Sequence, residues 1–241
     1  GNPRPDTLVL GTVSLGGKLT PEMRQCAREA VDAGLDVWNG MHEFLAHDAK
    51  LLGAAQEKGV TLWDVRRPPE NLTVGSARCL QAKSYICLGI GSDAAIGKMT
   101  TVLEMQKESQ RRGVSAEFIA TGQTGIMISG WGHPIDAIPG DFIAGCVEKD
   151  CLSVDGKCDV IYVEGQGSLF HPGFSAVTLG LMAGCCADGF ILCHQPSRKT
   201  VTRMDHIPLP PLPEIAEYYL QVQRALKPAK VLGIALNTWG M

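Results

Sequence analysis

The sequence has few aromatic residues, no long apolar run and no cluster of basic residues. Aromatic side chains make up 6% of the 241 residues. No apolar stretch approaches the ~18 residues that a membrane-spanning helix needs, and the chain does not open with a secretory signal pattern. We therefore expect a soluble, cytoplasmic protein without a membrane partner. Lys and Arg number 22 against 25 Asp and Glu. Because binding to a phosphate backbone needs clustered cations, we expect no nucleic-acid partner either.

The cysteines and histidines lack the paired spacing of a metal site. The nine cysteines are an odd number and sit mostly in apolar segments, which indicates reduced, buried thiols rather than a disulfide framework. Neither Cys146, Cys151 and Cys158 nor the adjacent Cys185 and Cys186 show the two-residue spacing that is typical of zinc sites. The histidines outside the motifs below share no ligand spacing: His42, His47, His133, His194 and His206.

Short apolar segments alternate with helical segments from one end of the chain to the other. This alternation predicts an α/β fold with parallel sheets. One expected helix begins with Thr20 as N-cap and Pro21 as first residue and ends at Gly34. The other expected helices are 48–58, 98–112, 175–186 and 214–226. The expected strands are 7–10, 35–38, 60–63, 85–90, 117–120, 160–163, 190–193 and 231–236.

Two proline-rich stretches interrupt this alternation. The run Arg66-Arg67-Pro68-Pro69 cannot continue a helix or a central strand. We therefore expect a linker over about 64–83, which divides the chain into domains 1–82 and 83–241. The second stretch, Ile207–Pro213, is predicted to be a stiff loop before a helix rather than a ligand for a proline-binding module.

The segment Gly91–Thr101 has the features of a phosphate-binding loop, and we call it the P-loop segment. A strand leads into it and a helix follows it. Its glycines allow a tight bend in which successive amides point at one anion, and the helix N-terminus and Lys98 add positive charge. A glycine-rich turn with a solvated lysine is the alternative. The predicted phosphate-binding residues are Gly91, Ser92, Asp93, Ala94, Ala95, Ile96, Gly97, Lys98, Met99, Thr100 and Thr101.

The P-loop segment departs from the standard P-loop pattern in two ways. Five residues rather than four separate Gly91 from Gly97. Met99 stands where Ser or Thr normally holds magnesium, and Thr100 or Thr101 offers the next hydroxyl. The pattern therefore predicts a phosphate site more firmly than a magnesium site.

Further candidate site residues follow other strands of the predicted sheet. Glu164 ends the strand 160–163 and is placed to face the P-loop segment, because ligands bind at the carboxyl ends of parallel strands. It could bind magnesium or accept a proton, and a structural strand-end acid is the alternative. His171 is a further acid/base candidate. Gln123, Thr124 and Gly125 follow the strand 117–120 and can offer polar groups to a ligand.

Two families share these motifs. Gly91–Lys98 with Val163-Glu164-Gly165 resembles dethiobiotin synthetase, and Asn237 resembles the asparagine with which that family contacts adenine. A bacterial family of unknown-function domains that includes the D-glutamate N-acetyltransferase DgcN is similar along nearly the whole chain. The resemblance is carried by Trp63–Pro69, Gly97–Thr101, Ala120–Ile128 and Val163–Pro172. Members of that family usually run longer at both ends, so we expect residues missing from each end of this chain.

The second resemblance implies a small Rossmann-like N-terminal domain, a larger P-loop NTPase-like domain and acetyl transfer from acetyl-CoA to the amine of D-glutamate. Glu164 and His171 are the base candidates, Asp93 a weaker one, and Lys98 completes the catalytic set. The guanidinium of an arginine can form two parallel hydrogen bonds to a carboxylate, and D-glutamate has two carboxylates. Arg66 and Arg67 are therefore the predicted substrate-binding residues. Lower-ranked alternatives are Arg198, Lys199 and Arg203. We also expect a homo-oligomer.

Two other functions remain open at this stage. An ATP-dependent ligase or NTPase would use ATP with Mg²⁺ at Thr100 and Glu164, and Met99 argues mildly against it. A non-catalytic nucleotide-binding module is the third hypothesis. The combination of Lys98, Glu164 and the paired arginines argues against that one.

Overall fold

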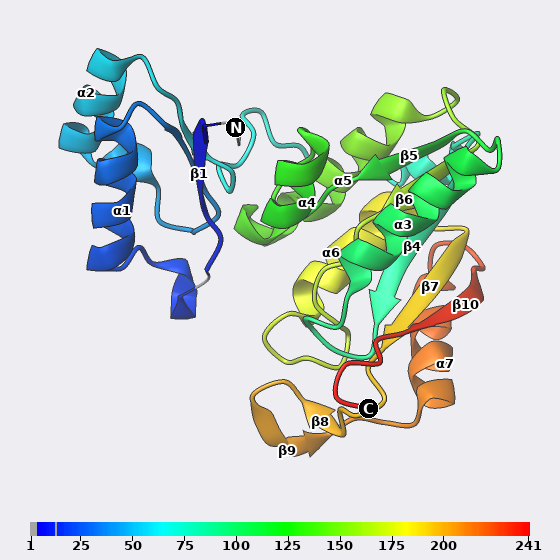
Figure 1. Ribbon diagram of the computed structural model, residues 1–241. Helices are drawn as coiled ribbons and strands as arrows, with labels where there is room; N and C mark the ends of the chain where they lie inside the picture. The colour runs from blue at the N-terminus through cyan, green and yellow to red at the C-terminus, as the bar shows by residue number, and fades with distance from the viewer. Residues whose placement is uncertain (1–3, 13) are drawn as a thin grey trace. The chain divides into compact units, whose positions relative to one another are not determined.

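The computed structural model describes residues 4–12 and 14–241. The chain forms two compact units, Gly1–Pro68 and Pro69–Met241, each built around its own parallel sheet (Figure 1). Within the described residues, no helix combines the length and the apolar character that crossing a membrane would need.

The first unit is a three-stranded parallel sheet with two helices. Its strands lie in the order β1 (Thr7–Leu10), β2 (Asp36–Asn39) and β3 (Leu62–Asp64). The helices are α1 (Pro21–Asp32), which Thr20 caps as predicted, and α2 (Ala49–Lys58), which Asp48 caps. Apolar residues of both helices and of β1 and β2 form one core. The predicted strands 35–38 and 60–63 are thus confirmed as elements, with bounds shifted by one or two residues.

The second unit carries a five-stranded parallel sheet in the order β10-β7-β4-β6-β5. The strands are β4 (Tyr85–Gly91), β5 (Ala116–Ile119), β6 (Val160–Val163), β7 (Gly189–His194) and β10 (Lys230–Leu236). The chain runs from β4 outward to β5, returns to β6, and then crosses to β7 on the other side of β4. The carboxyl end of β4 is therefore the point at which the strand order reverses, where ligands of such sheets bind.

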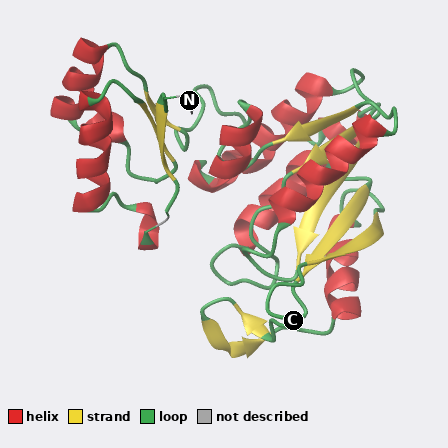
Figure 2. Cartoon of the chain, viewed as in Figure 1, coloured by secondary structure: helices red, strands yellow, loops and turns green. Residues whose placement is uncertain are grey.

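Helices cover the sheet of the second unit on both faces (Figure 2). Alternate residues of β4 point to opposite faces. Ile86, Leu88 and Ile90 share a core with side chains of α5 (Gly140–Val154) and α6 (Ser175–Cys185). Gly89 lies against Val102 of α3 (Lys98–Arg111) on the other face. A further helix, α7 (Leu212–Gln223), packs beside β10.

Three elements of the second unit were not predicted from the sequence. The helices α4 (Gln123–Ser129) and α5 lie between β5 and β6, and a hairpin of β8 (Thr200–Val201) and β9 (Met204–Pro208) follows β7. Hydrophobic periodicity does not predict α5, because the buried side of this helix includes the charged residues Glu148 and Asp150. Glu148 is satisfied there by the amide and guanidinium of Arg78, at 2.7 and 2.8 Å.

The prediction of a stiff loop over Ile207–Pro213 is wrong at both ends. Ile207 and Pro208 end the edge strand β9, where a proline removes no ladder hydrogen bond that the sheet needs. Leu212 and Pro213 form the first turn of α7, where a proline has no intrahelical partner to lose. Only residues 209–211 connect the two elements.

Candidate functional site

The P-loop segment makes a tight bend between β4 and the N-terminus of α3. Gly97 lies at φ 100° and Ala95 at φ 52°, so the backbone enters the left-handed region twice within three residues. Lys98, the first residue of α3, turns back over this bend. Its ammonium donates to the carbonyl oxygen of Asp93 at 2.8 Å, and the side chain is buried, with 6% of its surface exposed. The structure thus brings the lysine to the bend, as the motif predicts.

Several amides of the bend are available to a ligand. Among the described residues, the N–H groups of Ala95, Ile96 and Gly97 donate to no protein acceptor. The amide of Ser92, by contrast, donates to Cys193 of β7 at 3.1 Å, and that of Ala94 to the carboxylate of Asp93 at 2.7 Å. Unpaired amides next to a helix N-terminus and an ammonium group form an environment that favours an anion.

Distant parts of the chain hold the P-loop segment in place. Asp93 accepts hydrogen bonds from Arg198 at 3.0 Å and from the amide of Thr202 at 2.7 Å. The hydroxyl of Tyr219 on α7 donates to the carbonyl of Gly91 at 2.9 Å. The side-chain amide of Asn237 donates to Ile96 at 3.4 Å, which places the predicted adenine-contacting residue against the loop. These contacts fix the shape of the bend from outside it.

Glu164 lies at the carboxyl end of β6, beside β4, and is 3% exposed. Its Oε2 accepts the amides of Thr121 at 2.8 Å and Gly122 at 3.1 Å, and its Oε1 accepts the side-chain amide of Gln166 at 3.1 Å. The absence of a side chain at Gly125 makes room for this arrangement, since a Cβ there would collide with the carboxylate.

Glu164 and Lys98 are both buried, and burial brings their pKa values closer together. Burial raises the pKa of Glu164 to about 7, with the nearby charge of Asp136 adding to the rise and the amides of Thr121 and Gly122 opposing it. Burial lowers the pKa of Lys98 to about 8, opposed by neighbouring negative charge. A carboxylate with a pKa near neutrality is suited to accept a proton from a reacting group and to release it again.

The raised pKa of Glu164 predicts that its carboxylate destabilises the folded protein above neutral pH. Below its usual pKa of 4.5 the group is protonated in both the folded and the unfolded state. As pH rises to about 7, the unfolded state ionises first, and the fold loses on the order of 3 kcal/mol. We expect Glu164→Gln to gain stability relative to the wild type over this interval. Urea unfolding of both proteins at pH 4.5 and 7.5 measures this difference. A difference independent of pH would contradict the raised pKa.

The other residues predicted near Glu164 have different environments. Gln123 and Thr124 begin α4, half-buried and exposed, respectively. His171 is buried, stacks on Phe174 and accepts the amide of Gly173 at 3.2 Å on Nδ1. No hydrogen bond joins His171 to Glu164 or Lys98 in the described structure. His171 therefore shapes its own loop.

The residues predicted to hold magnesium do not form a prepared cation site. Thr101 is half-buried, and Thr100 lies on the exposed side of α3. The carboxylate of Glu164 already accepts three N–H donors, from Thr121, Gly122 and Gln166. As they stand, these side chains do not fit a magnesium ion.

The two arginines predicted to bind substrate carboxylates belong to the first unit and differ from each other. Arg66 is buried, 5% exposed, and its Nε donates to the carbonyl of Gly40 at 2.7 Å. The side chain of Arg67 is 60% exposed, and its guanidinium lies 5.6 Å from the ring centroid of Phe44 and 3.9 Å from Asp64. Arg67 can therefore reach a ligand without disturbing the fold, whereas Arg66 stabilises the loop after β2.

Sequence reasoning missed two residues at this site and one contact of a third. Tyr219 and Asp136 lie 128 and 28 residues away from the groups they influence, Gly91 and Glu164, so no local pattern could find them. The sequence analysis offers Arg198, after the strand 190–193, as an alternative ligand for a substrate carboxylate. In the structure its Nη1 donates to the carbonyl of Ala94 at 2.6 Å, a contact that the sequence does not predict.

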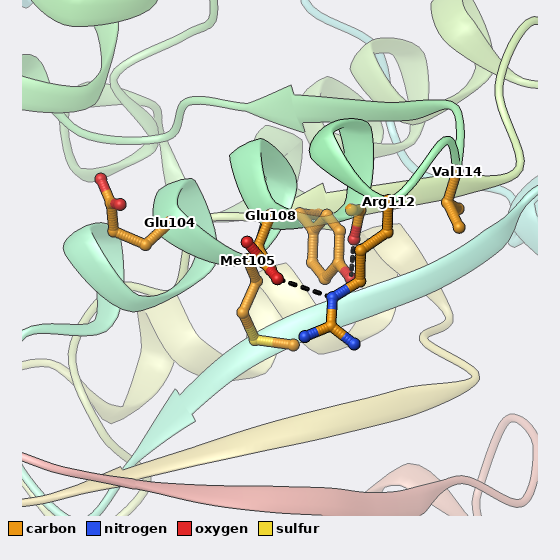
Figure 3. Close-up of a pocket in the computed structure, with 7 residues that line it drawn as sticks. Glu104, Met105, Glu108, Arg112 and Val114 are labelled. Carbon is orange, nitrogen blue, oxygen red and sulfur yellow. Dashed lines mark hydrogen bonds and ion pairs between the residues drawn. The ribbon is translucent and has the colours of Figure 1, made fainter.

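A groove of about 420 Å³ runs along the later turns of α3, at the opposite end of that helix from Lys98 (Figure 3). Its charged groups are paired, because Glu108 accepts from Arg111 and Arg112 at 2.6 Å and Glu104 accepts from Lys107 at 2.8 Å. The hydroxyls of Ser109 and Tyr162 lie 3.0 Å apart. The groove therefore offers no unpaired charge to a ligand. It is lined by Glu104, Met105, Glu108, Ser109, Arg112, Val114 and Tyr162.

Comparison with known proteins agrees with this architecture. Residues 1–68 match a Rossmann-like domain of unknown function, DUF1611_N, and residues 73–241 match a P-loop domain of unknown function, DUF1611_C. The chain is 39% identical over 234 residues to a D-glutamate N-acetyltransferase of Tritonibacter scottomollicae and 34% identical over 236 residues to one of a Pseudoalteromonas species. Each alignment covers 96% of this chain and 69% of the relative.

A crystal structure of a DUF1611 family protein from Anabaena variabilis superposes with a TM-score of 0.94 at 38% identity, covering 99% of this chain and 70% of that one. The predicted order of a Rossmann-like domain followed by a P-loop domain is thereby confirmed. Both domains and nearly the full length of the chain match, and the protein accordingly belongs to the DUF1611 family.

Proposed function

We propose that this protein is an N-acetyltransferase that transfers the acetyl group of acetyl-CoA to the amine of D-glutamate. Two relatives with 39% and 34% identity carry the name D-glutamate N-acetyltransferase. One observation in this chain carries the proposal. The second unit contains both a P-loop segment whose amides are unpaired and a buried carboxylate whose pKa is about 7. The first group suits a phosphorylated acyl donor and the second suits proton removal from an amine.

The P-loop segment binds a phosphate of the acyl donor in this proposal. Acetyl-CoA carries a pyrophosphate and a further phosphate on its ribose, and either presents oxygens to the amides of Ala95, Ile96 and Gly97. Lys98 already bends over this position, so its ammonium needs to exchange only the carbonyl of Asp93 for a phosphate oxygen. In the proposed reaction the P-loop segment only binds acetyl-CoA, so the reaction does not require hydrolysis of a nucleotide.

Glu164 accepts the proton in the proposed reaction. The ammonium of D-glutamate gives one proton to the carboxylate, and the nitrogen lone pair attacks the thioester carbon. The tetrahedral intermediate collapses when its carbon–sulfur bond breaks, and the departing thiolate takes up the second proton that the nitrogen loses as the amide forms. Glu164 then releases the first proton to solvent. With a pKa of about 7, Glu164 can serve each turnover at neutral pH without an external base.

Thiol release tests the proposed function directly. The protein is incubated with acetyl-CoA and D-glutamate while free thiol is followed with a colorimetric reagent. We expect thiol release that depends on D-glutamate. L-glutamate tests whether the reaction depends on the chirality of the substrate, and D-glutamine tests whether it depends on the charge of the side chain. A parallel reaction with ATP and Mg²⁺ is followed for phosphate. Phosphate release without thiol release would overturn the transferase in favour of an ATP-dependent ligase.

We propose Arg67 as a ligand of a substrate carboxylate. Arg67→Ala should raise KM for D-glutamate by about 10-fold or more, the scale of a charged hydrogen bond, and leave KM for acetyl-CoA unchanged. Arg66→Ala is the comparison, because removing that buried side chain frees the carbonyl of Gly40 and should lower Tm first. Initial rates at varied concentrations of each substrate, with Tm for both variants, separate the two effects. Equal changes in both KM values for Arg67→Ala would contradict the assignment.

A further inference from the structure

Three side chains with different metal-binding atoms converge at the β5 edge of the second unit. Cys146 and Asp150 lie four residues apart on α5, a spacing that places them on the same side of the helix. His133 approaches them from the loop after α4. The nitrogen, sulfur and oxygen donor atoms of these residues all lie within 4.8 Å of one another. The sequence spacing does not predict this cluster, because 12 residues of loop and helix lie between His133 and Cys146.

The cluster contains a buried sulfur without a hydrogen-bond partner. Cys146 and Asp150 are 4% exposed each. The Nδ1 of His133 lies 2.8 and 2.9 Å from the two carboxylate oxygens of Asp150. The thiol of Cys146 makes no hydrogen bond to any described residue. Among the described residues, four other buried thiols reach an oxygen acceptor, whereas the buried thiol of Cys87, like that of Cys146, does not. The four are Cys79, Cys158, Cys185 and Cys186.

We infer that His133, Cys146 and Asp150 form a binding site for a zinc ion. Imidazole nitrogen, thiolate sulfur and carboxylate oxygen are the three kinds of ligand that zinc takes in proteins, and three protein ligands leave a fourth position for water. Magnesium and calcium prefer oxygen alone, so the sulfur selects against them. The two negative charges that Asp150 and the thiolate supply equal the charge of the ion, which lowers the cost of burying it.

Binding exchanges a proton for the metal without any change of oxidation state. The S–H bond of Cys146 breaks, the proton goes to solvent, and the sulfur lone pair forms a bond to zinc. The proton that Nδ1 of His133 donates to Asp150 moves to Nε2, so that the Nδ1 lone pair binds the ion, and Asp150 contributes an oxygen.

The proposed ion would tie α5 to the backbone that holds Glu164. The amide of His133 donates to Ala120 at 3.2 Å, and the amide of Ile135 donates to Thr121 at 3.1 Å. Thr121 in turn donates its amide to the carboxylate of Glu164. Zinc would therefore stabilise the segment 120–135 against α5. The inference stands independently of the proposed acetyl transfer, because it rests on the cluster alone.

Cobalt substitution tests the site. The full chain is treated with a chelator, dialysed and titrated with Co²⁺ while its absorption is recorded. We expect one equivalent of Co²⁺ to produce a thiolate-to-cobalt charge-transfer band, which Zn²⁺ then abolishes by displacement. The band should disappear in Cys146→Ser and persist in Cys26→Ser, the matched control, because Cys26 is an exposed cysteine of the first unit. Saturating Zn²⁺ should also raise Tm of the wild type.

A second variant keeps the test decisive if Cys146→Ser does not fold. His133 is partly exposed, so His133→Gln should fold, and we expect its affinity for Zn²⁺ to fall roughly 10-fold or more. No charge-transfer band in the wild type would overturn the inference. A band that survives in both Cys146→Ser and His133→Gln, or that is lost in Cys26→Ser, would place the metal elsewhere and overturn it as well.

Discussion

Glu164→Gln should lower kcat for acetyl transfer by about 10²- to 10⁴-fold, the range that a positioned general base contributes. Glutamine has the same shape and keeps one oxygen for the amides of Thr121 and Gly122, so the site should retain its form. It cannot accept a proton from the substrate ammonium. We expect KM for acetyl-CoA to stay near the wild-type value, because Glu164 takes no part in binding the donor phosphate.

Steady-state thiol release at saturating acetyl-CoA and D-glutamate measures the loss. Glu108→Gln is the matched control, since Glu108 is a carboxylate on the surface of α3 that pairs with Arg111 and Arg112. That variant should retain full activity. A loss smaller than about tenfold in Glu164→Gln would show that another group accepts the proton. The pH profile adds a second readout, because the rising limb of kcat in the wild type should be centred near pH 7 and should vanish in the variant.

Lys98→Met should weaken the binding of acetyl-CoA by roughly 10- to 150-fold, which corresponds to the 1.5–3 kcal/mol of a hydrogen bond to a charged group. Methionine fills most of the space of the lysine stem, which passes between Gly91 and Gly165. The substitution therefore removes the ammonium group and leaves the bend packed. It also removes a buried charge, so the folded protein should not lose stability.

Isothermal titration calorimetry with CoA and with acetyl-CoA measures this effect without turnover. Lys107→Met is the matched control, because Lys107 lies on the same helix, exposed and paired with Glu104. Its affinity for both ligands should equal that of the wild type. If Lys98→Met binds CoA as tightly as the wild type does, the P-loop segment does not hold the donor phosphate.

Much of the second unit's architecture could be predicted because its signals are local. The strand before Gly91, the glycines, Lys98 and the helix after it follow one another within about 20 residues, and the structure has each element where the pattern places it. The position of Glu164 also followed from sequence, since a strand-end acid in a parallel sheet lies at the ligand-binding edge. The helix α5 could not be predicted in this way. Its buried side carries Glu148 and Asp150, whose partners come from distant segments.

By itself, the sequence determined the order of the domains, the parallel α/β class and the chemical character of the P-loop segment. Each depends on periodicity, turn residues or spacing, which are properties of neighbouring residues. Only the tertiary structure decided that Arg66 is buried and Arg67 exposed, that Tyr219 and Arg198 hold the bend, and that His133 meets Cys146 and Asp150. These facts depend on contacts between residues far apart in the chain. Burial and the electrostatic environment, which set the pKa of Glu164, exist only once those contacts have formed.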